Sequence, residues 1–101
     1  MPQTRGVADV EIRNDRELSR VEARVDGAVA GFAAYRDSPG RRIFTHTEVD
    51  PAFEGQGVGG ALARAALDRA RADGVRVIPD CPFIRGWIDR HPAYAGLVVD
   101  E

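Results

Sequence analysis

The chain has 101 residues, of which 44% are hydrophobic and 30% are charged, so its size and composition are those of a single globular domain spanning residues 1–101. Its formal net charge of −2 argues against general binding to nucleic acids or membrane surfaces, which requires a basic patch. One cysteine and two histidines are too few for a structural zinc site, so we expect no metal. No apolar run approaches the roughly 20 residues of a membrane helix and no leader-like segment is seen, so we expect a cytoplasmic protein.

The first half of the chain has the patterns of β-strands joined by tight turns. Ser19, Val21, Ala23 and Val25 alternate with charged residues, which is the period of a half-exposed strand. A hairpin turn is expected at Asp26-Gly27 and a second turn at "RDSPG", residues 36–40. The four strands are expected at residues 7–13, 19–25, 28–35 and 41–49. Their short connections predict an antiparallel meander.

The second half changes to a helical period. From Gly57 to about Gly74, small apolar residues recur on one stripe of an amphipathic helix. "VRVIP" at residues 75–79 predicts a fifth strand, and residues 82–91 predict a short C-terminal helix that begins with a proline. The helical crossover between the fourth and fifth strands predicts that these two are parallel. The fold class is therefore α+β.

The stretch "GQGVGG" places four glycines in six positions, residues 55–60, directly before the helix. It satisfies the G-x-G-x-x-G pattern of dinucleotide-binding folds, and Asp80 follows about twenty residues later. However, "DPAFE" separates the preceding strand from these glycines, whereas in that motif the strand leads directly into the first glycine. The property that does not depend on the motif is simpler: exposed N–H groups at a helix N-terminus form a site for phosphate oxygens.

The segment from "EVDPAFEGQGVGGAL" to "RVIP" resembles the acetyl-coenzyme A binding core of the GCN5-related N-acetyltransferases. In the family's loop pattern, Gln/Arg-x-x-Gly-x-Gly/Ala, the three defined places are filled by Gln56, Gly59 and Ala61. Residues 43–96 as a whole are similar to a minimal, short single-domain branch of that superfamily. The resemblance implies a minimal fold of four antiparallel strands, a helix, a parallel fifth strand and a short helix.

The same resemblance assigns cofactor contacts. The pyrophosphate of coenzyme A is expected to bind the backbone amides of residues 56–61, and the pantetheine arm is expected to lie beside the fourth strand, near Glu48 and Val49. The implied cofactor-binding residues are Val49, Gln56, Gly57, Val58, Gly59, Gly60 and Ala61. The helices between the first two strands and the C-terminal strands of larger relatives are absent, so the acceptor, an amine on a small molecule or a protein, stays open.

Two residues are candidates for catalysis. Cys81 lies at the expected start of the second helix, where a thiolate nucleophile is favoured, and the alternative is a buried packing residue. The two-residue period of the strand predicts that Glu48, His46 and Phe44 share one face, and either polar side chain has the chemistry of a base for an acceptor amine. The alternative is a surface pair held by neighbouring arginines.

Other residues have weaker claims. Tyr94 is a candidate acid by residue type alone, and Arg85 and Arg90 are candidates for phosphate contacts. His91 is expected to be hydrogen-bonded near the helix end, and Trp87 to pack on the sheet or line the acceptor face. Two functions follow: an acetyl-coenzyme A-dependent N-acetyltransferase, or a coenzyme A-binding module with little or no transferase activity.

Overall fold

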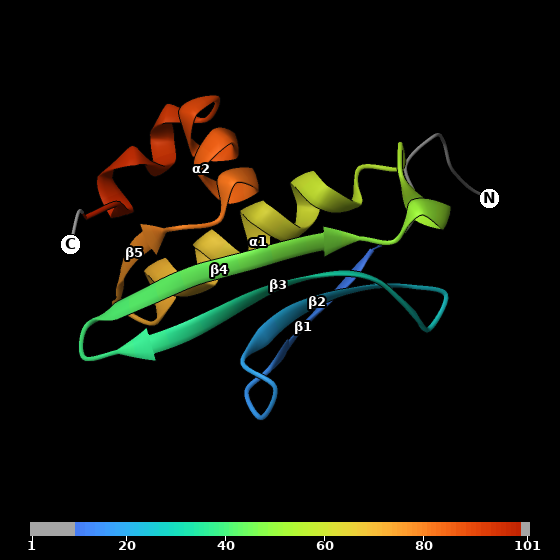
Figure 1. The fold of residues 1–101 in the computed structure, drawn as a ribbon, viewed down its shortest axis with the longest axis horizontal. Coiled ribbons are helices and arrows are strands. Elements are labelled where there is room, and N and C mark those ends of the chain that lie inside the picture. The colour runs from blue at the N-terminus through green and yellow to red at the C-terminus, as the bar shows by residue number, and fades with distance from the viewer. Residues whose placement is uncertain (1–9, 100–101) are drawn as a thin grey trace.

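The computed structural model describes residues 10–99 (Figure 1). A five-stranded sheet has the strand order β1-β2-β3-β4-β5, in which the first four strands are antiparallel and β5 is parallel to β4. The strands are β1 (Glu11–Asp15), β2 (Arg20–Val25), β3 (Ala28–Ser38), β4 (Arg41–Val49) and β5 (Arg76–Pro79). The helices are α1 (Val58–Ala72) and α2 (Pro82–Asp89), with the short 3-10 helices η1 (Pro51–Phe53) and η2 (Pro92–Leu97). The expected α+β architecture is confirmed.

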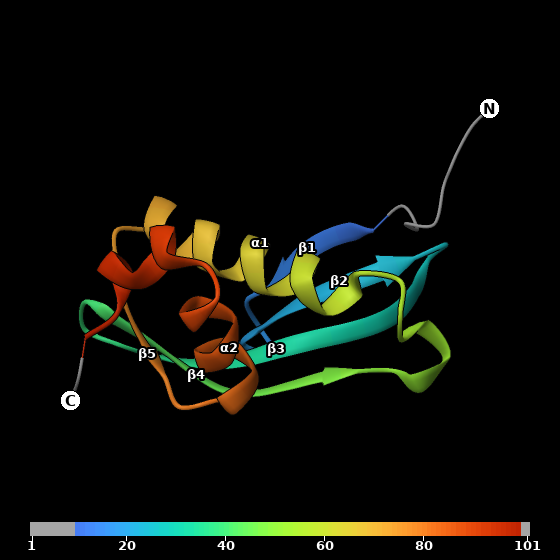
Figure 2. The same cartoon turned by 90° about the horizontal axis from the view of Figure 1, so that it is seen from above.

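Both α-helices lie on the same side of the sheet (Figure 2). The buried face of α1 packs on β2 and β3, and its small side chains let the helix approach the strands closely. Its buried residues are Val58, Leu62, Ala63, Ala66, Leu67 and Ala70. The other face of the sheet, which we call the outer face, is covered by no helix within residues 10–99 (Figure 2). None of the helices in that range is long and apolar enough to cross a membrane.

Several element boundaries differ from those expected. The first strand covers residues 11–15 rather than 7–13, and residues 7–9 lie outside the described part of the chain. The strand β3 continues to Ser38, so the turn after it is confined to Pro39 and Gly40. The two 3-10 helices follow Asp50 and His91, each with a proline at the start, where the missing N–H costs no hydrogen bond.

A buried carboxylate holds part of the outer face together. The alternation in β2 places Glu22 on the opposite face from the core residues, yet Glu22 is only 2% exposed. Arg20 donates to one oxygen at 2.9 and 2.7 Å, and Arg24 donates to the other at 3.2 and 3.0 Å. The hydrogen bonds from Arg20 are the main reason that the pKa of Glu22 lies below its usual value, with those from Arg24 adding to the effect.

We expect this carboxylate to make the fold sensitive to acid. The pKa of Glu22 is lower in the folded than in the unfolded chain. The stability that the ionised side chain contributes is therefore fully present above the unfolded-state pKa and is lost as pH falls through the folded-state pKa. Glu22→Gln should therefore flatten the fall in stability below about pH 4.5 and cost about 2 kcal/mol at neutral pH. Urea unfolding across pH measures both effects. Glu11→Gln on the neighbouring strand, where the side chain is 65% exposed, should change neither.

Candidate functional site

The glycine-rich loop brings the chain from β4 to α1 in a tight path. Gly55 and Gly57 have φ values of 82° and 79°, in the left-handed region that glycine enters without strain. Gly57 is the N-cap of α1, and it caps the helix without a side-chain hydrogen bond. Residues 50–57 separate β4 from the helix, so the strand does not lead directly into the glycines as it does in a dinucleotide-binding motif.

The loop leaves backbone donors at the start of the helix. The first intrahelical hydrogen bond of α1 runs from the Ala61 amide to the Gly57 carbonyl at 3.0 Å. The amides of residues 58–60 precede that bond and have no partner within the helix. Ala61, which we had included among the amides for a phosphate, is therefore already engaged. Binding of an anion by this loop stays a prediction, and it now concerns the turn around Gly57 and the amides of residues 58–60.

Beside this loop, β4 and β5 separate. Their pairing ends at Phe44 and Pro79, and the amide of Cys81 donates to the Phe44 carbonyl at 2.9 Å. Beyond Phe44, β4 continues to Val49 without β5 at its side, because Pro79 ends that strand (Figure 1). This divergence gives the last residues of β4 a backbone edge that pairs with no strand among the described elements.

Three segments meet at this edge, and we call the contact region the β4–α2 junction, formed by Thr47, Val49, Gly59, Cys81 and Phe83. The Cys81 thiol, only 3% exposed, donates to the Thr47 hydroxyl at 3.1 Å. A Cβ built on Gly59 would lie 2.8 Å from the tip of the Phe83 ring and 3.6 Å from a methyl of Val49. The aromatic ring therefore lies against the first turn of α1. Sequence reasoning found Cys81 and Gly59 but missed Phe83, whose only signal is its place two residues after Cys81.

A β-bulge changes which face of the sheet Glu48 occupies. The register of β3 and β4 shifts between Ala34 and Tyr35, so that Thr45 has no direct partner. Phe44 packs in the core, whereas His46 and Glu48 are exposed and pair with each other at 3.3 Å. Our prediction that Glu48, His46 and Phe44 share one face is therefore wrong for Phe44. An extra residue in a strand moves every following side chain to the other face.

The C-terminal aromatic residues form a structural cluster on α1. Trp87 is buried and stacks on His91, with ring centroids 3.7 Å apart, and the His91 ring is hydrogen-bonded to the Trp87 carbonyl at 2.7 Å. The Tyr94 hydroxyl donates to Asp68 at 2.9 Å and accepts from Arg64 at 3.3 Å. His91 thus has the expected hydrogen bond near the helix end. Trp87 packs in the core, and Tyr94 is engaged with the middle of α1.

The two arginine candidates for phosphate contacts lie on the surface of the C-terminal half. Arg85 and Arg90 lie on α2 and directly after it, and both are exposed. Their positions leave phosphate contacts an untested prediction. Within residues 10–99, no group of three or more His, Cys, Asp and Glu side chains is arranged to hold a metal ion.

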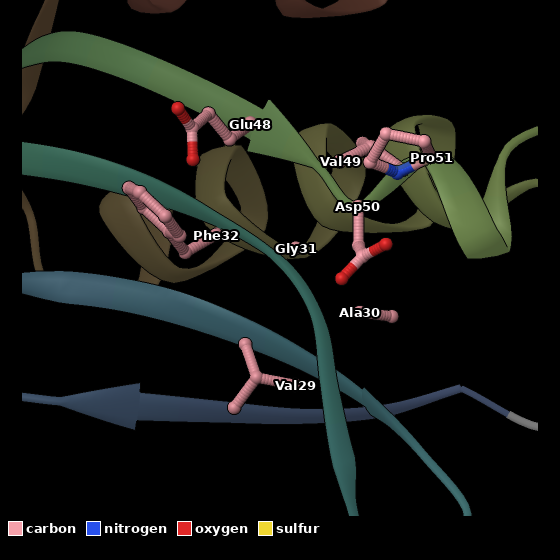
Figure 3. A pocket seen from close by; sticks show the side chains of 8 residues that line it. All are labelled: Val29, Ala30, Gly31, Phe32, Glu48, Val49, Asp50 and Pro51. Atoms are coloured by element: carbon pink, nitrogen blue, oxygen red, sulfur yellow. The ribbon is translucent and has the colours of Figure 1, made fainter.

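A hollow of about 500 Å³ lies on the outer face of the sheet, where β3 and β4 approach the start of η1 (Figure 3). It is lined by Val29, Ala30, Gly31, Phe32, Glu48, Val49, Asp50 and Pro51. Only Glu48 and Val49 among these were singled out from the sequence. Asp50 and Pro51 entered the sequence interpretation only as part of "DPAFE", the segment that separates the strand from the glycines.

Comparison with known proteins identifies relatives that match most of the chain. The model of a family described as GCN5-related N-acetyl-transferase matches residues 20–97, which covers β2 through η2. The curated protein named NATD1 from Gallus gallus is 27% identical over 85 residues, which are 82% of this chain and 77% of that protein. NATD1 from Homo sapiens is also 27% identical, over 82% of this chain and 75% of that protein.

Solved structures share the fold. A GCN5-like protein from Staphylococcus aureus has a TM-score of 0.69 and 22% identity, covering 90% of this chain and 89% of the other. A ribosomal-protein-alanine N-acetyltransferase from Brucella melitensis has a TM-score of 0.56 and 24% identity, covering 81% and 62%. At these identities the likeness concerns the fold alone.

Proposed function

The chain belongs to the GCN5-related N-acetyltransferase family, and we propose that it transfers an acetyl group from acetyl-coenzyme A to a primary amine. Members of this family use acetyl-coenzyme A as the acetyl donor. The observation that carries the proposal is that two features lie next to each other: amides at the start of α1 without a partner in the helix, and an edge of β4 without a partner strand directly before them.

The residues around the glycine loop fit a coenzyme A molecule. The amides of residues 58–60, with the turn formed by Gln56 and Gly57, supply donors to pyrophosphate oxygens, and the positive end of the α1 dipole favours their charge. The edge of β4 near Val49 supplies backbone groups to an extended arm. Because the Phe83 ring lies against Gly59, we propose that this ring rotates away when the arm binds.

The proposed chemistry is direct attack by the amine. When bound, acetyl-coenzyme A supplies the thioester carbonyl carbon that the amine attacks. Glu48, paired with His46 at 3.3 Å on the exposed face of β4, accepts the proton that the acceptor ammonium must lose first. In this proposal, backbone N–H groups on the edge of β4 that lacks a partner strand stabilise negative charge on the acetyl oxygen, which the end of the β4–β5 pairing at Phe44 supports. In this scheme Cys81 lines the acetyl site through its contact with Thr47.

A thermal and calorimetric titration tests the cofactor assignment. Coenzyme A and acetyl-coenzyme A should raise the melting temperature, because a ligand that binds only the folded state stabilises it, and NAD⁺ at the same concentration should not. Release of free thiol with a panel of amines then tests transfer. Equal stabilisation by NAD⁺ would contradict the assignment.

The alternative, a coenzyme A-binding module, is favoured by one observation. Within residues 10–99 no helix covers the outer face of the sheet beside Glu48, so an acceptor bound on that face would stay open to solvent. A binding module would show cofactor affinity without thiol release for any amine in the panel.

Replacement of Cys81 distinguishes a side chain that only lines the acetyl site from one that attacks the thioester. We expect Cys81→Ser to lower turnover by less than about tenfold, the worth of one weakened hydrogen bond, with coenzyme A affinity unchanged. A covalent role predicts a much larger loss, because serine is a far weaker nucleophile. Intact-mass spectrometry of rapidly quenched wild-type protein provides the second measurement: an acetyl adduct that Cys81→Ser lacks would establish the covalent route instead.

A further inference from the structure

The outer-face hollow has a floor of two small residues and apolar side chains beside it. Ala30 and Gly31 present almost nothing but backbone there, and β3 and β4 are so close that a Cβ on Gly31 would lie 2.6 Å from the Glu48 carbonyl oxygen. Val29 and Phe32 stand on either side of this floor (Figure 3). The volume of about 500 Å³ is in the range of small-molecule sites.

The charge of the hollow has one sign. Its eight lining residues include the carboxylates of Glu48 and Asp50, and none of the eight is basic. Figure 3 shows these carboxylates with Gly31 between them. Asp50 accepts a hydrogen bond from the Ala52 amide through one oxygen at 2.9 Å, which orients the side chain and leaves its other oxygen for a ligand.

Two guanidinium groups on this face, those of Arg20 and Arg24, are already engaged. Arg20 and Arg24 are both hydrogen-bonded to Glu22, and Arg20 also lies over one face of the Phe32 ring, 4.7 Å from its centre. Phe32 therefore offers an apolar wall rather than a second cation site. A ligand with a positive end and an uncharged body matches this lining.

The hollow adjoins the proposed transfer site. Glu48 and Val49 line it, and a methyl of Val49 also lies 3.6 Å from the position of a Cβ on Gly59, at the start of α1. The last residues of β4 thus separate the hollow from the glycine loop. A group held in the hollow lies beside the carboxylate that we propose as the base.

We propose that this hollow is the acceptor site and that it selects small primary alkylammonium ions without a carboxylate of their own. The inference rests on the proposed function. Glu48 takes one proton from the ammonium, the nitrogen lone pair forms a bond to the acetyl carbon, and the carbon–sulfur bond breaks with its electron pair moving to sulfur. A second proton leaves the nitrogen as the amide forms. One of the two protons ends on the thiol of coenzyme A and the other is released.

The test compares propylamine with β-alanine, which has a chain of similar size but adds a carboxylate. We expect kcat/KM for propylamine to exceed that for β-alanine by about tenfold or more, because a ligand carboxylate would face Glu48 and Asp50. Asp50→Asn should reduce this ratio about fivefold while leaving coenzyme A affinity unchanged. Asparagine also caps a helix, so the turn at η1 is kept. Glu17→Gln, in the turn between β1 and β2, is the matched control and should keep the wild-type ratio.

A binding measurement makes failure of this inference distinguishable from failure of the proposed function. Propylammonium should shift the backbone NMR signals of residues 29–32 and 48–50 in wild-type protein, and less so in Asp50→Asn. Transfer with no such shifts, or with a ratio that Asp50→Asn leaves unchanged, would overturn the acceptor site and leave the function standing. These shifts without thiol release from any amine would support the site and overturn the transferase.

Discussion

Gly59→Asp is expected to weaken coenzyme A binding at least tenfold, the largest effect that we expect on cofactor affinity. The carboxylate would enter the first turn of α1, where the proposed phosphate oxygens meet the amides of residues 58–60. The new side chain would meet the tip of the Phe83 ring at 2.8 Å, and that flexible tip is able to move. Isothermal titration calorimetry measures the affinity.

The fold of this variant should be intact or slightly more stable, because an acidic side chain in the first turn of a helix interacts favourably with its dipole. Loss of affinity with an unchanged or higher melting temperature therefore separates a binding effect from unfolding. Gly59→Asn is the matched control, since it adds nearly the same volume without the charge. A folded Gly59→Asp protein with wild-type affinity would refute the phosphate site.

The second large effect concerns Glu48. We expect Glu48→Gln to lower kcat/KM about a hundredfold near neutral pH, because an amide cannot accept the proton of the acceptor ammonium. Coenzyme A affinity should not change, since this side chain lies on the outer face of β4 and pairs with His46. The difference in kcat/KM between wild type and Glu48→Gln should shrink as pH rises toward the pKa of the amine itself, where the acceptor is already neutral.

The pH profile distinguishes a base from a residue that only supports the strand. A structural loss would lower the rate by the same factor at every pH, whereas loss of a base is repaired at high pH. Glu17→Gln, remote from the hollow in the turn before β2, provides the control for removing one surface carboxylate. A pH-rate profile of Glu48→Gln that parallels the wild type would rule out Glu48 as the base.

The order of the elements could be predicted from local patterns, because each pattern depends on neighbouring residues alone. The two-residue period in β2 and the apolar stripe of α1 place the core-facing side chains correctly. The resemblance of the segment around "GQGVGG" to the N-acetyltransferase core, which the family match over residues 20–97 confirms, came from a continuous stretch of sequence. The start of α1 at the glycines was predictable for the same reason.

The arrangement of the candidate site was decided by contacts between segments far apart in the chain. The bulge at Thr45 depends on how β4 pairs with β3, and no local pattern in "FTHTEV" reveals that Glu48 and Phe44 lie on opposite faces. The burial of Glu22 likewise depends on where Arg20 and Arg24 fold over it.

The hollow and the β4–α2 junction also depend on contacts between segments that are far apart in the chain. Phe83 reaches Gly59 only because α2 packs beside α1, and Asp50 and Phe32 line one hollow only because β3 and β4 lie side by side. The sequence by itself determined the elements, their order and the start of α1 at the glycine-rich loop. Which side chains share a face and which face one another was decided by tertiary structure, because strand register and helix packing are set by the whole core at once.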